Sequence, residues 1–459
     1  NLDLYETHQR GRELWKALAS YALKDIDETS KGNSKLFDFI EAATRFEELL
    51  YGLEPYYRDH TLHSLWVYLI GEHLQRDCLP NMYKNTNWYL FNDIERDHKE
   101  YNYDKKLVNE AKKKEKQFCD KVNKKKDAIW CLMALCHDLG YSLAKLNNLN
   151  DRVKDVLEFF DLPEFQRIGY SLDIEQQYNV SQFLELMAMD VRIEPSENLR
   201  DEKVESKEKV LIKGYRENST YWRLCRALEK KQHGILSAYL VYKILGIFAD
   251  SWIRDPAEKW GFDDSEVIDN IIRGDILFGI AQHDFEFAYL YELGSLADIL
   301  ILADELEEFS RYGRQLRTRK YHDTIANSRI KFKPKKPEQG KDIEIDILYT
   351  VKKDADSLSF FKRKAKRLCH IYSLELYSQK QDQDGNKSCK IKNIKMTVKN
   401  DKGEEYSFKL NRDSIHKGCL PGDNNNKNGE YDLCFRDDEL YVCDKDKEVA
   451  LNKWIPDQE

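Results

Sequence analysis

The sequence lacks several features that would assign it to a special class of protein. No uninterrupted apolar run approaches the roughly 20 residues that a transmembrane helix needs, and residues 1–12 contain no apolar core of a secretory signal. Proline and glycine are scarce, with 9 and 20 residues among 459, while 41% of the residues are hydrophobic. This composition excludes collagen-like and disordered chains, and it predicts a folded protein with no membrane partner.

The sequence also lacks an excess of positive charge and a cysteine framework. Its 74 Lys and Arg stand against 82 Asp and Glu, and the net charge of −8 disfavours nucleic acid and anionic lipid as partners, although a local basic surface stays open. The ten cysteines form no C-x-x-C pair, and some stand in apolar runs, such as Cys131 and Cys136. We therefore expect reduced thiols and a cytoplasmic location.

The apolar pattern divides the chain into two parts. Between residue 34 and about residue 320, apolar side chains mostly recur at helical spacing, as in Leu236-Tyr239-Leu240. After Tyr321 they alternate with polar side chains, which indicates half-buried strands, and one helical stretch remains at residues 360–377. We predict a mainly α fold, with a helical domain over residues 1–325 and a smaller α+β domain over residues 326–459.

Two charged insertions interrupt the helical part. Residues 98–126 are rich in Lys and Glu, which predicts a solvated helix, with a phosphate-attracting arm as the alternative. Residues 195–213 are polar and typical of an exposed insertion between helices.

Metal-binding residue types stand in several apolar helical contexts of the first part. The central one is His137-Asp138, which follows the apolar run of residues 129–136. The whole set, in chain order, is His63, His137, Asp138, His233, His283 and Asp304. Imidazoles and carboxylates that converge from several helices form sites for divalent metals, and a buried charge is costly unless it is paired or metal-bound. The alternative is that each His is a satisfied core residue and that Asp304 pairs with an arginine such as Arg311.

This ordered set resembles the HD-domain superfamily of metal-dependent phosphohydrolases, over about residues 35–320. The residues that carry the resemblance are His63-Ser64-Leu65 followed by Val67, then His137-Asp138-Leu139-Gly140, then Leu302-Ala303-Asp304. They look like the family's first-His, central His-Asp and distal Asp motifs. The resemblance implies a helical fold that places these side chains around one or more metals. It also implies that His233 and His283 bind a second metal or act on the phosphate.

Two departures from the family patterns bear on the substrate. The deoxynucleoside triphosphate triphosphohydrolase branch usually carries a His where this chain has Tyr141. The Gly-Tyr-Pro signature of a cyclic dinucleotide branch is absent. His60, three residues before His63, lies on the same predicted helical face and competes with it as a ligand. We prefer His63 because Ser64 and Val67 follow it in the family's pattern.

The resemblance leads to a hypothesis for the site. His63, His137, Asp138 and Asp304 hold a first divalent ion, which these ligand types allow to be Mn, Mg, Fe, Ni or Zn. His233 and His283 complete a second ion site or bind the substrate phosphate, and with Asp138 they are the catalytic candidates. The candidates for contact with the substrate phosphate are Arg58, His60, Lys145 and Arg311.

The favoured function is nucleotide hydrolysis by an enzyme, with (deoxy)nucleoside triphosphates as the first substrate class. Two alternatives stay open: a two-metal phosphodiesterase for cyclic or linear oligonucleotides, and a regulatory module that senses a nucleotide without turnover. A nucleotide substrate is the expected partner, and a nucleotide activator is compatible with the family. We expect the C-terminal domain to mediate formation of a homo-oligomer.

Overall fold

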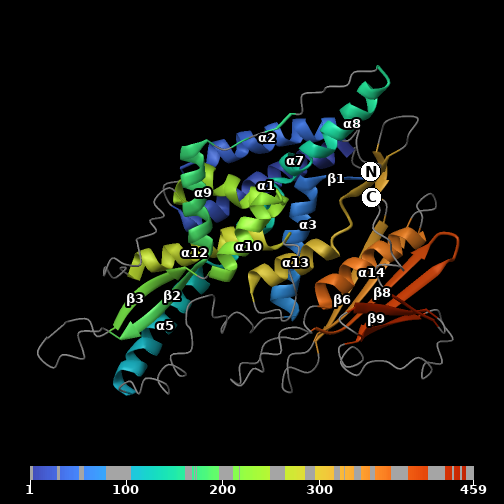
Figure 1. The fold of residues 1–459 in the computed structure, drawn as a ribbon. Coiled ribbons are helices and arrows are strands. Elements are labelled where there is room, and N and C mark those ends of the chain that lie inside the picture. Colours follow the sequence, from blue (N-terminus) through green and yellow to red (C-terminus); the bar gives the residue numbers. More distant parts are fainter. Residues whose placement is uncertain are drawn as a thin grey trace, which may run out of the picture. The chain divides into compact units, whose positions relative to one another are not determined.

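A computed structural model describes residues 4–27, 31–50, 56–78, 105–160, 168–169, 171, 173–195, 210–216, 218–248, 264–284, 295–314, 321–324, 326–334, 343–351, 357–373, 391–411, 430–436, 439–444 and 447–450. Within these residues the protein is mostly helical with a smaller sheet, which confirms the coarse fold prediction (Figure 1). None of the described helices combines the length and the apolarity that a membrane crossing requires. The chain divides into two compact units: the first unit is residues 1–53 with 84–286, and the second unit is residues 54–83 with 287–459.

The first unit holds most of the helices. Its helices are α1 (Leu4–Ile26), α2 (Asn33–Leu50), α5 (Lys105–Lys124), α6 (Lys126–Cys136), α7 (Tyr141–Ala144), α8 (Leu146–Glu158), α9 (Ile174–Met187), α10 (Asn218–Glu229), α11 (His233–Ile244) and α12 (Asp264–Gln282), with a 3₁₀ turn η4 (Gly246–Phe248). The core helix is α6, whose residues 128–136 are all buried. A helix that is apolar on every side must be surrounded by other elements. Here α1, α11 and α12 pack against α6.

The charged insertion at residues 98–126 forms a helix, as predicted, over the residues that the structure describes. Its lysines at 112, 113, 116 and 121 are exposed, whereas Phe118 and Val122 are buried. Phe118 and Val122 thus face the protein interior while these lysines face solvent, and α5 packs against α12. Residues 98–104 of the predicted insertion lie outside the described residues.

The prediction that residues 34–320 are entirely helical is wrong. An antiparallel hairpin of β2 (Met189–Pro195) and β3 (Val210–Arg216) lies between α9 and α10 in the sequence. In β2, Val191 and Ile193 alternate with charged residues over too few positions to stand out from the helical periodicity around them. The polar insertion predicted at residues 195–213 thus begins and ends in strands, and residues 196–209 lie outside the described residues.

The second unit combines short strands with two helices that carry predicted ligands. It starts with β1 (Tyr56–Arg58), α3 (His60–His73) and a π-helical turn η1 (Leu74–Cys78), and continues with α13 (Leu296–Leu306), β4 (Arg311–Arg314) and β5 (Tyr321–Thr324). The three short strands form one sheet in the order β1-β4-β5. Because β1 immediately precedes α3 and β4 follows α13, this sheet fixes the neighbouring ends of both helices.

The remainder of the second unit is an α+β module that starts next to the predicted boundary near residue 325. Its elements are β6 (Ala326–Pro334), β7 (Ile343–Val351), α14 (Ser357–Ser373), β8 (Ile391–Asn400), β9 (Glu405–Asn411), β10 (Glu430–Arg436), β11 (Glu439–Asp444) and β12 (Lys447–Ala450). They form a sheet in the order β12-β11-β10-β9-β8-β7-β6. Alternate residues of β7 are buried, as the period-two pattern predicted, and α14 packs on β8 and β9 (Figure 1).

Candidate metal centre

The first ligand cluster begins where α6 ends. His137 follows the buried run of this helix as its C-cap residue and is itself fully buried. Its Nδ1 donates a hydrogen bond to the carbonyl oxygen of Ala134 at 2.8 Å. Because a neutral imidazole carries one proton, this bond leaves Nε2 as the nitrogen with the lone pair, which is the arrangement of a metal-ligating histidine.

Histidine Nε2 atoms converge on the carboxylate of Asp138, which is 8% exposed. The oxygens of Asp138 lie 3.6 Å from Nε2 of His137, 3.1 Å from that of His233 and 3.5 Å from that of His283. Nδ1 of His283 donates to the carbonyl oxygen of Ile280 at 2.6 Å, so it repeats the arrangement of His137. Burial raises the pKa of Asp138, but its polar contacts with the neighbouring imidazoles of His137, His233 and His283 outweigh burial and lower this pKa well below its usual value. Asp138 is therefore ionised at neutral pH.

His233 begins α11 and is held by Asp284. One carboxylate oxygen of Asp284 accepts from the backbone N–H of His233 at 3.0 Å and from its Nδ1 at 2.7 Å. Burial lowers the pKa of His233, but Asp284 and Asp138 together raise it to about 10. The ring therefore carries both protons at neutral pH. Its Nε2 donates toward Asp138 and lies 3.1 Å from Nε2 of His283.

Gly140, two residues after Asp138, allows this close arrangement. A Cβ atom at Gly140 would lie 2.5 Å from the backbone nitrogen of Ser237 and 2.6 Å from the carbonyl oxygen of His233. The N–H of Gly140 donates to Oγ of Ser237 at 2.7 Å, and this hydroxyl donates to the His233 carbonyl oxygen at 2.8 Å. Since any side chain at position 140 would push α7 away from α11, the glycine holds Asp138 next to His233.

His137, Asp138 and His283 form a set that can hold a metal ion. One ligand atom from each lies within 4.8 Å of the others, and all three side chains are buried. Two imidazoles and a carboxylate suit Mn, Fe, Ni or Zn. A histidine must lose a proton before it binds a metal, so the protonated His233 is better suited to donate a proton or to contact a phosphate.

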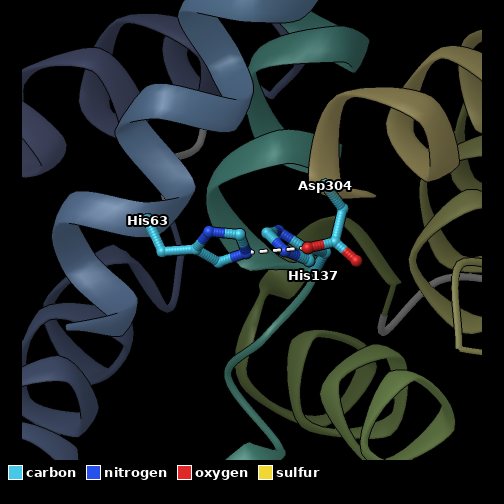
Figure 2. Close-up of side chains that lie close together, drawn as sticks. All are labelled: His63, His137 and Asp304. Atoms are coloured by element: carbon cyan, nitrogen blue, oxygen red, sulfur yellow. Dashed lines mark ion pairs between the residues drawn. The ribbon is translucent and has the colours of Figure 1, made fainter. Parts of the chain in front are cut away.

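The second cluster joins α3 and α13. Asp59 caps α3 by accepting from the N–H of Leu62 at 2.8 Å, and it thereby fixes the turn that carries the fully buried His63. Nε2 of His63 lies 2.9 Å from Oδ1 of Asp304, the ion pair drawn in Figure 2. Nδ1 of His63 donates to Oε2 of Glu307 at 2.6 Å. His137, also drawn in Figure 2, belongs to the first unit.

Glu307 is a fully buried support for His63. Its carboxylate also accepts from the backbone N–H of Ser310 at 2.7 Å and from the Ser310 hydroxyl at 2.8 Å. Burial and the Arg58 charge lower the pKa of His63, but Glu307 and Asp304 outweigh them, so the net shift is upward. Burial raises the pKa of Glu307, and His63 and Arg58 lower it below its usual value. The His63 imidazole and the Glu307 carboxylate thus stabilise each other inside the protein.

Asp304 lies in the last turn of α13, where the helix dipole disfavours a carboxylate. Arg58 on β1 compensates for this, because its Nη1 lies 3.3 Å from Oδ1 of Asp304 and 3.4 Å from Nε2 of His63. Among the described side chains Asp304 thus pairs with Arg58, and its suggested pairing with Arg311 stays a prediction. Arg311 lies on β4, and its side chain is outside the described ones.

The other predicted phosphate contacts lie near the clusters of their own units. The amino group of Lys145 stands over the Tyr141 ring, 4.9 Å from its centroid, and the Tyr141 ring packs edge-on against His233 at 5.5 Å. His60 is the first residue of α3 and is half-buried. Tyr141 therefore lies against the proton-bearing histidine of the first cluster, and Lys145 lies against Tyr141.

The sequence reasoning did not identify the carboxylates that support the histidines, Asp284 and Glu307. A signal for Asp284 was present, since His283-Asp284 is a second His-Asp dipeptide in the chain. Glu307 had no comparable signal, because it stands in the acidic stretch of residues 304–308 and its contact with His63 spans 244 positions.

No protein-family model matches this chain, and no curated protein or solved structure matches it either. The resemblance to the HD-domain superfamily therefore rests on the motif residues alone.

Proposed function

We propose that this protein is a metal-dependent phosphohydrolase of the HD type that acts on nucleotides, with (deoxy)nucleoside triphosphates as the first substrate class. One observation carries the proposal. Each of His63, His137 and His283 has Nδ1 bound to a carbonyl or carboxylate oxygen and directs Nε2 toward an aspartate. In metal-ligating histidines, the ring nitrogen that does not face the metal almost always donates to a carboxylate or carbonyl oxygen in the same way.

The metal would be held by His137 and Asp138 of the first unit, with His63 and Asp304 of the second unit. That these four residues serve one ion is what the resemblance in sequence implies. A bound divalent ion supplies Lewis acidity and makes a bound water a nucleophile near neutral pH. The imidazole-rich donor set favours Mn, Fe, Ni or Zn over Mg.

Three further roles in phosphate ester hydrolysis, which are water orientation, proton donation and charge neutralisation, are assigned to side chains of the first cluster and its neighbours. Asp138, ionised and surrounded by histidines, orients the attacking water. His233 carries a proton on the Nε2 that faces this carboxylate, and we assign it to protonate the leaving oxygen or to neutralise the phosphate. Lys145, next to Tyr141, supplies a second positive charge for the phosphate.

The two-metal phosphodiesterase is the second candidate function. A second ion would need His233 as a neutral ligand beside His283. The hydrogen bonds of His233 to Asp284 and its raised pKa oppose this, because they keep its proton in place. The complete donor set likewise opposes a sensing module that has lost catalysis.

The test is product analysis by chromatography after incubation of the pure protein with Mn²⁺, a mixture of nucleoside and deoxynucleoside triphosphates and a short oligonucleotide. Asp138→Ala should abolish turnover with unchanged helicity, while Asp155→Ala, which removes an exposed carboxylate of α8, should have no effect. Released nucleoside and intact triphosphate would establish a triphosphohydrolase despite Tyr141. A shortened oligonucleotide with untouched triphosphates would favour the phosphodiesterase, and turnover in Asp138→Ala would contradict the proposed site.

Self-association and a nucleotide activator remain proposals that the same preparation can address. Light scattering over micromolar concentrations should give a mass above that of one chain, because we expect the C-terminal module to mediate a homo-oligomer. A monomeric mass throughout would contradict this expectation. An increase in turnover when a second nucleotide is added would indicate an activator. The cytoplasmic location stays a prediction.

A further inference from the structure

A lysine of the C-terminal module is buried against the helix that carries Asp304. Lys364 on α14 is 5% exposed, which is rare for an ammonium group. Its Nζ donates to the carbonyl oxygen of Glu305 at 2.7 Å and lies 3.2 Å from Oε1 of Glu305 and 2.6 Å from Oε1 of Glu308. The charge of Lys364 is therefore satisfied by the end of α13 and the residues that follow it.

Glu308 is shared between two cations. It is 1% exposed, and its Oε1 lies 3.8 Å from Nη2 of Arg58 as well as 2.6 Å from Nζ of Lys364. The same Arg58 reaches Oδ1 of Asp304. A continuous path of charges thus runs from Lys364 through Glu308 and Arg58 to Asp304.

The other ionisable groups around Lys364 leave it free to pair with Glu308. Arg367, one turn further on α14, binds Oε2 of Glu305 at 3.1 Å, so Glu305 has its own cation at the surface. Tyr349 on β7 lies beneath, with the amino group of Lys364 5.9 Å from its ring centroid. Burial and the nearby Glu308 and Glu305 raise the pKa of Tyr349 well above its usual value, so it adds no charge. Of Lys364 and Arg58, Lys364 is the closer to Glu308.

We propose that Lys364 is a positioning residue, which sets the affinity of the His63–Asp304 pair for a divalent metal by dividing Glu308 between itself and Arg58. This inference rests on the proposed function, since it assumes that His63 and Asp304 bind metal. With Lys364 in place, Glu308 is neutralised and Arg58 stays beside Asp304, where it competes with a metal ion. Without Lys364, Glu308 draws Arg58 away, and Asp304 meets the metal with less competition.

The experiment is a calorimetric titration of the full chain with Mn²⁺ for the wild type, Lys364→Met, Lys364→Arg, Glu308→Gln and Arg363→Met. We expect Lys364→Met to bind Mn²⁺ about five-fold more tightly, because one positive charge near the ion is lost and Arg58 moves. Lys364→Arg should restore the wild-type affinity. Glu308→Gln should weaken binding by a similar factor, because Arg58 then pairs with Asp304 more closely.

The direction of the change in Mn²⁺ affinity distinguishes a positioning role of Lys364 from a purely structural one. Damage to the fold weakens metal binding in every variant, whereas this proposal requires opposite changes for Lys364→Met and Glu308→Gln. Arg363→Met is the matched control, since it removes one positive charge from an exposed position of the same helix and should leave the affinity unchanged. If Lys364→Met does not fold, the weakening in Glu308→Gln still tests the proposal.

Unchanged or weaker binding in folded Lys364→Met, or an equal change in Arg363→Met, would overturn the role of Lys364 alone. Unchanged binding in Glu308→Gln would do the same. Absence of Mn²⁺ binding by the wild type would instead overturn the metal centre of the proposed function, and the role of Lys364 with it.

Discussion

The two ligand clusters differ in how their central aspartate is neutralised. In the first unit, Asp138 is approached by three imidazoles, two of which have Nδ1 bound to backbone carbonyl oxygens. In the second unit, Asp304 is approached by one imidazole and by the guanidinium of Arg58. Both aspartates are satisfied, but by groups with different affinities for a proton.

The first cluster is therefore arranged to bind a metal as it stands, whereas in the second cluster a positive charge already occupies one side of the aspartate. A neutral imidazole binds a metal without any movement of the chain, because it only has to present its lone pair. A guanidinium cannot give up its proton, so Arg58 has to move or to share Asp304 when an ion binds. Under the proposed function, the first cluster therefore binds an ion without rearrangement, whereas the second binds one only as Arg58 yields Asp304.

The largest expected effect comes from removing one ligand in each cluster. His137→Ala and Asp304→Ala should each lower turnover by more than about a hundredfold, which exceeds the usual effect of residues that only support a ligand. If both clusters serve one ion, each variant loses the same tightly bound equivalent of Mn²⁺ in equilibrium dialysis, and the double variant loses no more. Loss of one equivalent in each single variant and of two in the double variant would mean separate ions.

A smaller effect is expected from Asp284→Asn, which changes the histidine that is held in its protonated form. Asp284 raises the pKa of His233, so its removal lowers this pKa and shortens the pH range in which the ring carries both protons. We expect the alkaline limb of the pH profile of kcat to move to lower pH, with about a 10-fold to 100-fold loss of activity. Glu229→Gln, at an exposed position of α10, is the control. An unmoved alkaline limb would argue against a proton on His233 in the active state.

The smallest effect is expected at a buried aspartate outside the two clusters. Asp275 on α12 is 4% exposed, and its Oδ2 has no hydrogen-bond partner among the described residues. Burial raises its pKa well above the usual value, so the folded protein holds this proton at pH values where the unfolded chain has lost it. The protonated carboxyl group of Asp275 therefore contributes its full stabilisation of the folded state below about pH 4. This contribution to the free energy of unfolding is lost as the pH rises and the buried group has to ionise.

The variant Asp275→Asn should remove this pH dependence. We expect it to increase the free energy of unfolding by about 1–3 kcal/mol at pH 8 and to change little at pH 4, as measured by denaturant titration followed by circular dichroism. Asp269→Asn, at an exposed position of the same helix, should leave stability unchanged at both pH values. A loss of stability in Asp275→Asn at pH 8 would show that this carboxylate is ionised and paired.

The residues of the two clusters could be singled out from sequence because each stands in or next to an apolar helical run, where an ionisable side chain is unexpected. Their supports could not be predicted in this way. Lys364 appears in the sequence as one of several basic residues on α14, and its burial depends on Glu305 and Glu308, more than 50 positions earlier. The three-residue strand β1 was missed for a related reason, since it exists only by pairing with β4, which follows α13.

The first helix also takes part in the site, although it contains no predicted ligand. Trp15 on α1 is 1% exposed and donates from Nε1 to the carbonyl oxygen of Leu135 at 3.2 Å, two residues before His137. Trimming the chain to the stretch that carries the motifs would keep every ligand but remove one wall of the helix that delivers His137 and Asp138. The smallest portable form of this centre, for grafting or miniaturisation, therefore includes α1.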